Sequence, residues 1–119
     1  MLFRSNTSAA GARVQEWFAL YGATRAGANE LIHAAGLEAA PYGVTVNGTG
    51  TYAMNYPSFL HDVGADTDPA KLKAVTDQLP MRKLCEPEDA AYFVAGLIDG
   101  KNTAMTGQFI PIDGGWTLM

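Results

Sequence analysis

Two side chains that could do acid–base chemistry, Tyr21 and Arg25, stand four residues apart in a segment whose pattern predicts a helix. At that spacing both side chains leave the helix on one face, about a turn apart. The guanidinium stays charged at working pH and favours the phenolate form of a neighbouring tyrosine. A tyrosine held in this way is a candidate general base, although the spacing taken alone favours a surface Tyr–Arg pair.

Two polar segments follow predicted strands and could complete such a site. Ser8 comes directly after the opening apolar residues, and a loop rich in glycine and aromatic residues runs over 48–60, after a β-branched strand over 44–47. In open parallel sheets, ligands bind outside the carboxyl ends of the strands. We therefore expect the Ser8 hydroxyl to hold an oxygen atom beside the Tyr21 phenol, with the loop lining the same crevice.

The composition argues against several classes of function. A chain of 119 residues is one domain at most, and a net charge of −4 without a basic cluster disfavours binding to nucleic acid or to an anionic membrane surface. No apolar run approaches the roughly 18 residues of a spanning helix. Cys85 is the sole cysteine, so no internal disulfide can form and a cytoplasmic location is expected. His33 and His61 lack partners at ligand spacing, so no metal site is predicted.

The hydrophobic pattern predicts alternating strands and helices. After a strand that ends near Ser8, the expected elements are a helix over 19–40, the strand over 44–47, helices over 66–78 and 86–100, and a strand over 106–112. This order predicts parallel strands joined by right-handed crossovers. The first helix is expected to bury an apolar stripe: Leu31, Ile32, Ala35 and Leu37.

Three parallel strands are too few for a stable sheet, because such strands need both faces covered. We therefore expect residues 1–119 to be one partial catalytic domain. Its expected fold class is α/β, the carboxyl-terminal half of a Rossmann-like, doubly wound parallel sheet whose amino-terminal strands are missing.

Several motifs in this order resemble the second half of a short-chain dehydrogenase/reductase fold, over nearly the whole chain. They are Ser8, Tyr21-x-x-x-Arg25, Val46-Asn47, the segments 79–84 and 86–89, and the segments 106–108 and 113–115. Oxidoreductases of this superfamily carry Tyr-x-x-x-Lys, whose lysine also holds the nicotinamide ribose. With arginine at that position, the spacing Ser8-x12-Tyr21-x3-Arg25 is similar to the signature of halohydrin dehalogenases.

The resemblance implies a lyase that converts vicinal halohydrins to epoxides and releases halide, and that opens epoxides with small anions in reverse. No nicotinamide cofactor is expected, since no hydride moves. Reductases usually have Pro-Gly after the strand that ends at Asn47, whereas Tyr52 here would crowd the nicotinamide. The implied catalytic residues are Ser8, Tyr21 and Arg25; the implied halide and substrate pocket is Thr51, Tyr52, Ala53, Met54, Tyr56 and Phe59.

Other interpretations stay open. One is a nicotinamide-dependent reductase in which arginine replaces lysine; another is a truncated chain without catalytic activity. The relatives are commonly homotetramers, so an oligomer is expected. Gly27 costs its helix about 0.5–1 kcal/mol relative to alanine, which suggests either a close second subunit or simple tolerance.

Overall fold

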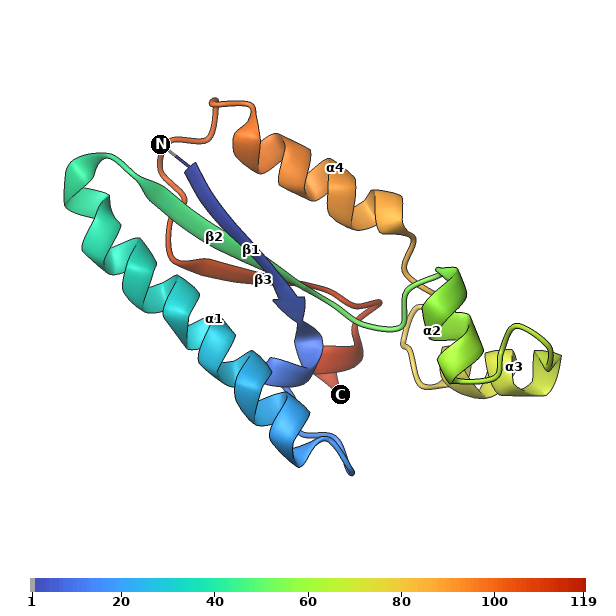
Figure 1. Cartoon of the computed structure of the whole chain (residues 1–119). Coiled ribbons are helices and arrows are strands. Elements are labelled where there is room, and N and C mark those ends of the chain that lie inside the picture. The colour runs from blue at the N-terminus through green and yellow to red at the C-terminus, as the bar shows by residue number, and fades with distance from the viewer. Residues whose placement is uncertain (1) are drawn as a thin grey trace.

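The computed structural model describes residues 2–119, with side chains described from Ser5 onward, and forms one parallel sheet in the order β1-β2-β3. The strands are β1 (Leu2–Ser8), β2 (Thr45–Thr51) and β3 (Gln108–Ile112). The long helix α1 (Ala19–Ala39) connects β1 to β2. Between β2 and β3 come α2 (Pro57–Asp62), α3 (Pro69–Asp77) and α4 (Pro87–Ile98) (Figure 1). Short 3-10 turns follow β1 (Ala9–Gly11), α1 (Ala40–Tyr42) and β3 (Trp116–Leu118).

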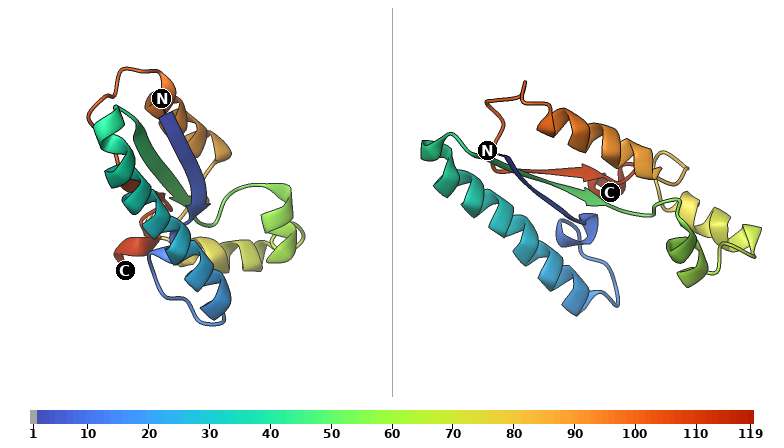
Figure 2. Two further views of the ribbon diagram at one scale, coloured as in Figure 1. Left: turned by 60° about the vertical axis from the view of Figure 1, so that its left-hand side comes forward. Right: turned by 45° about the horizontal axis from the view of Figure 1, so that its top comes forward.

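The helices α1 and α4 lie on opposite faces of the sheet, while α2 and α3 form a lobe beyond the carboxyl ends of the strands (Figures 1 and 2). The three strands lie side by side in chain order, so the two crossovers have the same hand only if their helices cover the same face of the sheet. The helices α1 and α4 cover opposite faces, and the two crossovers therefore have opposite hands. The prediction of right-handed crossovers is therefore wrong for one connection. The right-handed preference describes one helix that packs straight back on its sheet, whereas the β2–β3 connection carries three helices.

The central strand β2 is longer than predicted, because its glycines face neighbouring side chains instead of forming a loop. A Cβ on Gly48 would lie 2.1 Å from Cδ1 of Ile32 in α1, and one on Gly50 would lie 2.3 Å from the Phe109 ring. The absent side chains let α1 and β3 pack closely on a strand that is buried from Val46 to Gly50. The predicted loop over 48–60 is thus wrong at both ends, where β2 and α2 are found.

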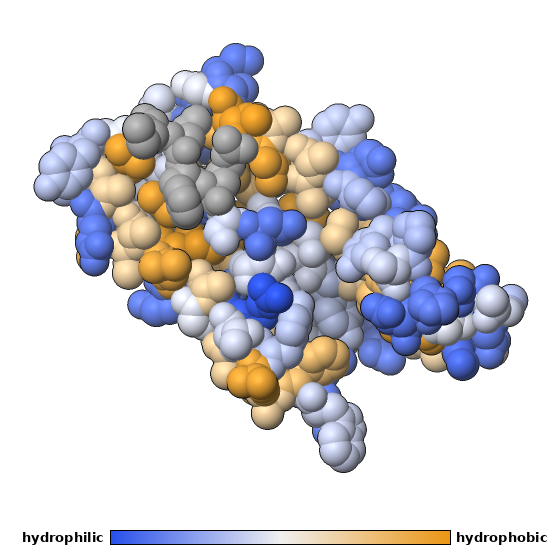
Figure 3. Space-filling view, viewed as in Figure 1, coloured by the Kyte–Doolittle hydropathy of each residue, from blue (hydrophilic) through white to orange (hydrophobic). Residues whose placement is uncertain are grey.

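The helix α1 buries fewer apolar residues than predicted. Ile32 is 2% exposed, but Leu31 is 65% and Leu37 is 77% exposed. The helix approaches the sheet through Gly36, whose missing Cβ would lie 2.4 Å from Cα of Gly107. With this contact the two leucines point outward. Apolar side chains gather over α1 and the adjoining sheet, while the α2–α3 lobe is mostly hydrophilic (Figure 3).

The chain is extended for its length. Its radius of gyration is 15.6 Å, against about 13.5 Å for a compact domain of this size. Its accessible surface is 7356 Å², against about 6,200 Å² for a compact monomer of this mass. One core cluster, formed by Ala9, Ala53, Leu79, Leu84 and Trp116, packs near the carboxyl ends of the strands, and Ile32, Val46 and Leu97 are buried elsewhere. Within residues 2–119, no helix is long and apolar enough to cross a membrane.

Candidate active site

A cavity of about 780 Å³ opens at the carboxyl ends of β1 and β2. Its walls come from α1, from the loops after the two strands, and from α2. Every residue predicted for the site lines this cavity: Ser8, Tyr21, Arg25, Thr51, Tyr52, Ala53, Met54, Tyr56 and Phe59. The fold thus brings the predicted residues to one place, and their chemical roles stay a prediction.

Ser8 ends β1 and caps the turn that follows. Its Oγ accepts a hydrogen bond from the Ala10 amide at 3.2 Å and lies 3.5 Å from the carbonyl oxygen of Thr51, its neighbour on β2. In the second contact the hydroxyl donates to the Thr51 carbonyl, and its length makes it a weak O–H···O bond. A substrate oxygen placed closer to Ser8 would compete for this proton.

Tyr21 and Arg25 meet on one face of α1, as their spacing predicts. The guanidinium carbon of Arg25 lies 4.7 Å from the centre of the Tyr21 ring, and the Phe18 ring packs edge-on against Tyr21 at 5.5 Å. No carboxylate pairs with Arg25 among the described residues, and its buried Nε has no protein acceptor. The positive charge is therefore directed at the Tyr21 ring and the cavity.

Gly11 sets the distance between the Ser8 turn and α1. A Cβ at Gly11 would lie 2.5 Å from the carbonyl carbon of Arg25 and 2.7 Å from the amide nitrogen of Ala26. Only a residue without a side chain lets the turn touch the helix backbone this closely. Gly11 thus holds the turn after Ser8 against the backbone of α1 at Arg25, and Ser8, Tyr21 and Arg25 line the same cavity.

The loop after β2 is held in a strained conformation. Ala53 has a φ of 47°, in the left-handed region that residues other than glycine rarely adopt. Such a conformation costs on the order of 1–3 kcal/mol and persists only where neighbouring contacts impose it. Here the Ala53 carbonyl accepts from the Cys85 amide at 3.0 Å, and the Asn55 amide donates to the Cys85 carbonyl at 2.8 Å. The loop is therefore fixed from outside the cavity.

Two amides of this loop lack a protein acceptor among the described residues. Within the described part of the chain, the amides of Ala53 and Met54 donate to no protein acceptor. Both residues line the cavity. Adjacent free N–H groups are donors that small anions accept readily.

Tyr52 differs from Tyr21 in its surroundings. Its ring stacks on Trp116 with centres 4.1 Å apart and an angle of 13° between the planes. The pKa of Tyr52 is raised above its usual 10, chiefly because burial disfavours the phenolate; contact with Gln15 and the charge of Arg13 act more weakly in the opposite direction. Tyr52 is thus a neutral hydrogen-bond donor at neutral pH and is unsuited to act as a base.

Sequence reasoning missed several residues of the cavity wall. They are Asn6, Thr7, Ala10, Gln15, Phe18, Asp62 and Val63. The position of Gln15 and Phe18 between Ser8 and Tyr21 was a usable signal, since a loop between two site residues passes the site. Asp62 and Val63 had no such signal, because they stand at the end of α2, a helix of only six residues that the sequence pattern did not predict.

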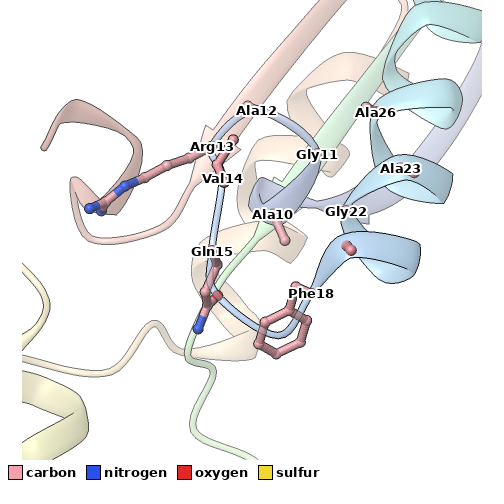
Figure 4. A pocket seen from close by; sticks show the side chains of 11 residues that line it. Ala10, Gly11, Ala12, Arg13, Val14, Gln15, Phe18, Gly22, Ala23 and Ala26 are labelled. Atoms are coloured by element: carbon pink, nitrogen blue, oxygen red, sulfur yellow. The ribbon is translucent and has the colours of Figure 1, made fainter.

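A smaller hollow of about 310 Å³ lies behind the loop over 12–18, between that loop and the first turns of α1. Figure 4 shows that its wall is built largely of small side chains, with Ala23 and Ala26 on the helix side. It contains no nucleophile and no acid–base pair. We assign no chemistry to it.

Cys85 and Asp113 have structural roles. Burial raises the pKa of the Cys85 thiol to about 11, with the Asp113 carboxylate adding to the effect, so a reactive thiolate is disfavoured. Asp113 is a turn residue: its carboxylate accepts from the amides of Gly115 at 2.9 Å and Thr117 at 2.8 Å. Among the described residues no group of His, Cys, Asp and Glu could hold a metal ion.

Comparisons with known proteins give a consistent family. A family model described as enoyl-(acyl carrier protein) reductase matches residues 5–117. A 2,5-dichloro-2,5-cyclohexadiene-1,4-diol dehydrogenase of Sphingobium indicum is 38% identical over 100 residues, which are 84% of this chain and 38% of that protein. The chain therefore spans well under half the length of this relative.

Solved structures match almost the whole chain. An actinorhodin polyketide ketoreductase with NADPH superimposes with a TM-score of 0.90 at 24% identity, over 99% of this chain and 48% of that one. A structure described as a dehalogenation enzyme gives a TM-score of 0.85 at 23% identity, over 97% of this chain and 47% of that one. At these identities the two structures establish the fold alone.

Proposed function

This chain belongs to the short-chain dehydrogenase/reductase superfamily, its parallel α/β fold is the one predicted, and we propose that it carries the catalytic half of a halohydrin dehalogenase. The observation that carries the proposal is the Arg25 guanidinium, 4.7 Å from the Tyr21 ring in a cavity that Ser8 and Tyr52 share. The proposed substrates are vicinal halohydrins and, in reverse, epoxides with small anions.

The proposed reaction needs three groups and no hydride. Tyr21, whose ring lies against the Arg25 guanidinium, acts as the base and takes the proton from the substrate hydroxyl, while Ser8 donates a hydrogen bond to that oxygen. The oxygen forms a bond to the adjacent carbon, and the carbon–halogen bond breaks with its electron pair leaving on the halide. The free amides of Ala53 and Met54 and the edge of Tyr52 are the proposed halide site. A positioned base contributes roughly 10²–10⁴-fold in rate.

A second candidate is a nicotinamide-dependent oxidoreductase. The matching family model is described as a reductase and the Sphingobium relative as a dehydrogenase, so the comparisons taken alone favour it. Two features of the chain fit a nicotinamide poorly: Arg25 stands where superfamily oxidoreductases carry lysine, and Tyr52 is fixed by its stack on Trp116 at the point where reductases leave room for the ring. The dehalogenase is therefore the function that the site geometry favours.

An Arg25→Lys variant of the intact protein separates the two candidates. A dehalogenase should release halide from a bromohydrin more slowly, because a compact ammonium cannot reproduce the guanidinium stacked on Tyr21. A reductase should keep or increase nicotinamide-dependent carbonyl reduction, since lysine is the superfamily's usual residue there. Arg82→Lys is the matched control, because Arg82 is exposed and outside the cavity. Faster carbonyl reduction with no halide release would replace the dehalogenase with the second candidate.

A further inference from the structure

Three side chains form a stack whose first member, Tyr52, lines the cavity, and each comes from the segment after a different strand. Arg13 follows β1, Tyr52 follows β2 and Trp116 follows β3. Figure 4 shows the Arg13 side chain extending away from α1, toward the turn that carries Trp116. The carboxyl ends of all three strands are thus tied together at this point.

The contacts within this stack are close and directional. Besides the nearly parallel Tyr52 and Trp116 rings, the guanidinium carbon of Arg13 lies 4.6 Å from the Trp116 ring centre. Arg13 Nη1 also donates a hydrogen bond of 2.6 Å to the Trp116 carbonyl oxygen. No carboxylate pairs with Arg13 among the described residues. Its charge is therefore engaged by Trp116 and remains close to Tyr52.

Trp116 is itself held firmly. Its side chain is 4% exposed, and the turn that presents it is closed by the Asp113 carboxylate through the amides of Gly115 and Thr117. A ring fixed in this way covers one face of Tyr52 and prevents that side chain from swinging toward Trp116. Tyr52 lines the cavity, whereas Trp116 and Arg13 do not.

We propose that Arg13 and Trp116 are positioning residues that fix Tyr52 at the cavity wall and thereby set how tightly the site holds the leaving halide. The inference rests on the proposed dehalogenase function. Neither residue touches the reacting atoms. Loosening the stack should therefore weaken halide binding and change the preference between bromide and chloride as leaving groups, while proton removal by Tyr21 is little affected.

The test measures inhibition of epoxide formation by added sodium bromide, together with kcat, for Arg13→Gln and Trp116→Leu in the intact protein. Each variant should weaken bromide inhibition by roughly three- to tenfold, the loss expected for one aromatic or cation–π contact, with a smaller change in kcat. Trp116→Phe, which keeps a stacking surface, should restore most of the inhibition. Matched controls are Arg82→Gln and Trp17→Phe, since Arg82 is exposed and Trp17 is 93% exposed.

The outcomes separate the stack from the reaction. Normal bromide inhibition in a folded Arg13→Gln variant, with halide release intact, would overturn the positioning role and leave the dehalogenase proposal standing. A fall in kcat and bromide affinity in parallel with the folded fraction would also overturn it, because that is the signature of a purely structural contact. Failure of the unaltered protein to release halide would overturn both proposals.

Discussion

The closest contact in the site gives the sharpest prediction, the substitution Gly11→Ala. The added Cβ would lie 2.5 Å from the carbonyl carbon of Arg25, where ordinary contact begins near 3.4 Å. The obstructing atoms are helix backbone and cannot rotate away, so the turn over 9–11 must move by about 1 Å from α1. Ser8 joins that turn directly and should move with it.

A displacement of about 1 Å can cost roughly 10²-fold in rate when it misplaces a catalytic group. The overpacking itself should destabilise the protein by about 1–3 kcal/mol. The assay is halide release from a bromohydrin, measured where chemical denaturation shows the variant to be fully folded. A large fall in kcat/KM at full folding is the expected result.

Gly96→Ala is the control for this substitution. Gly96 lies in α4, and a Cβ there would meet nothing within 4 Å. That change should leave turnover intact and stabilise the helix by about 0.5–1 kcal/mol. Unchanged turnover and stability in Gly11→Ala would refute the reasoning, because the turn would then have no fixed distance from α1.

Three further predictions concern single residues. Ser8→Ala should lower kcat/KM by about tenfold or more, the loss of one buried hydrogen bond of about 1–3 kcal/mol; an unchanged value would leave Ser8 only its capping role. The pKa of Cys85, near 11, leaves about one thiolate in a thousand at pH 8, so iodoacetamide should add mass only after unfolding, and rapid labelling of the folded protein would contradict this. Gly27→Leu should shift the intact protein to smaller species in size-exclusion chromatography if this exposed glycine faces another subunit; an unchanged profile would indicate simple tolerance.

Helices with clear signals in the local sequence were predicted correctly. The helix α4 begins where Glu86 and Pro87 indicate, and Glu86 forms a reciprocal capping box with Asp89. The helix predicted over 19–40 is found as α1 over Ala19–Ala39, and the spacing of Tyr21 and Arg25 correctly placed both on one face. These features depend on residues close together in sequence.

The rest depends on contacts between distant segments. The glycines of β2 read as a loop, and only the packing of Ile32 and Phe109 against them explains why they form a buried strand. Likewise, nothing local connects Tyr52 with Trp116, or Gly11 with the backbone of α1. The sequence could therefore nominate the reactive residues but could not identify the neighbours that position them.

The most direct test of the central claim is halide release by the intact protein from a small vicinal bromohydrin, with no nicotinamide added. We expect stoichiometric bromide and epoxide, and we expect Tyr21→Phe to abolish nearly all turnover, since it removes the phenolic oxygen and keeps the ring that packs against Phe18 and Arg25. Full bromide release by Tyr21→Phe would contradict the assigned base. Carbonyl reduction that requires a nicotinamide, with no bromide released by the unaltered protein, would contradict the dehalogenase itself.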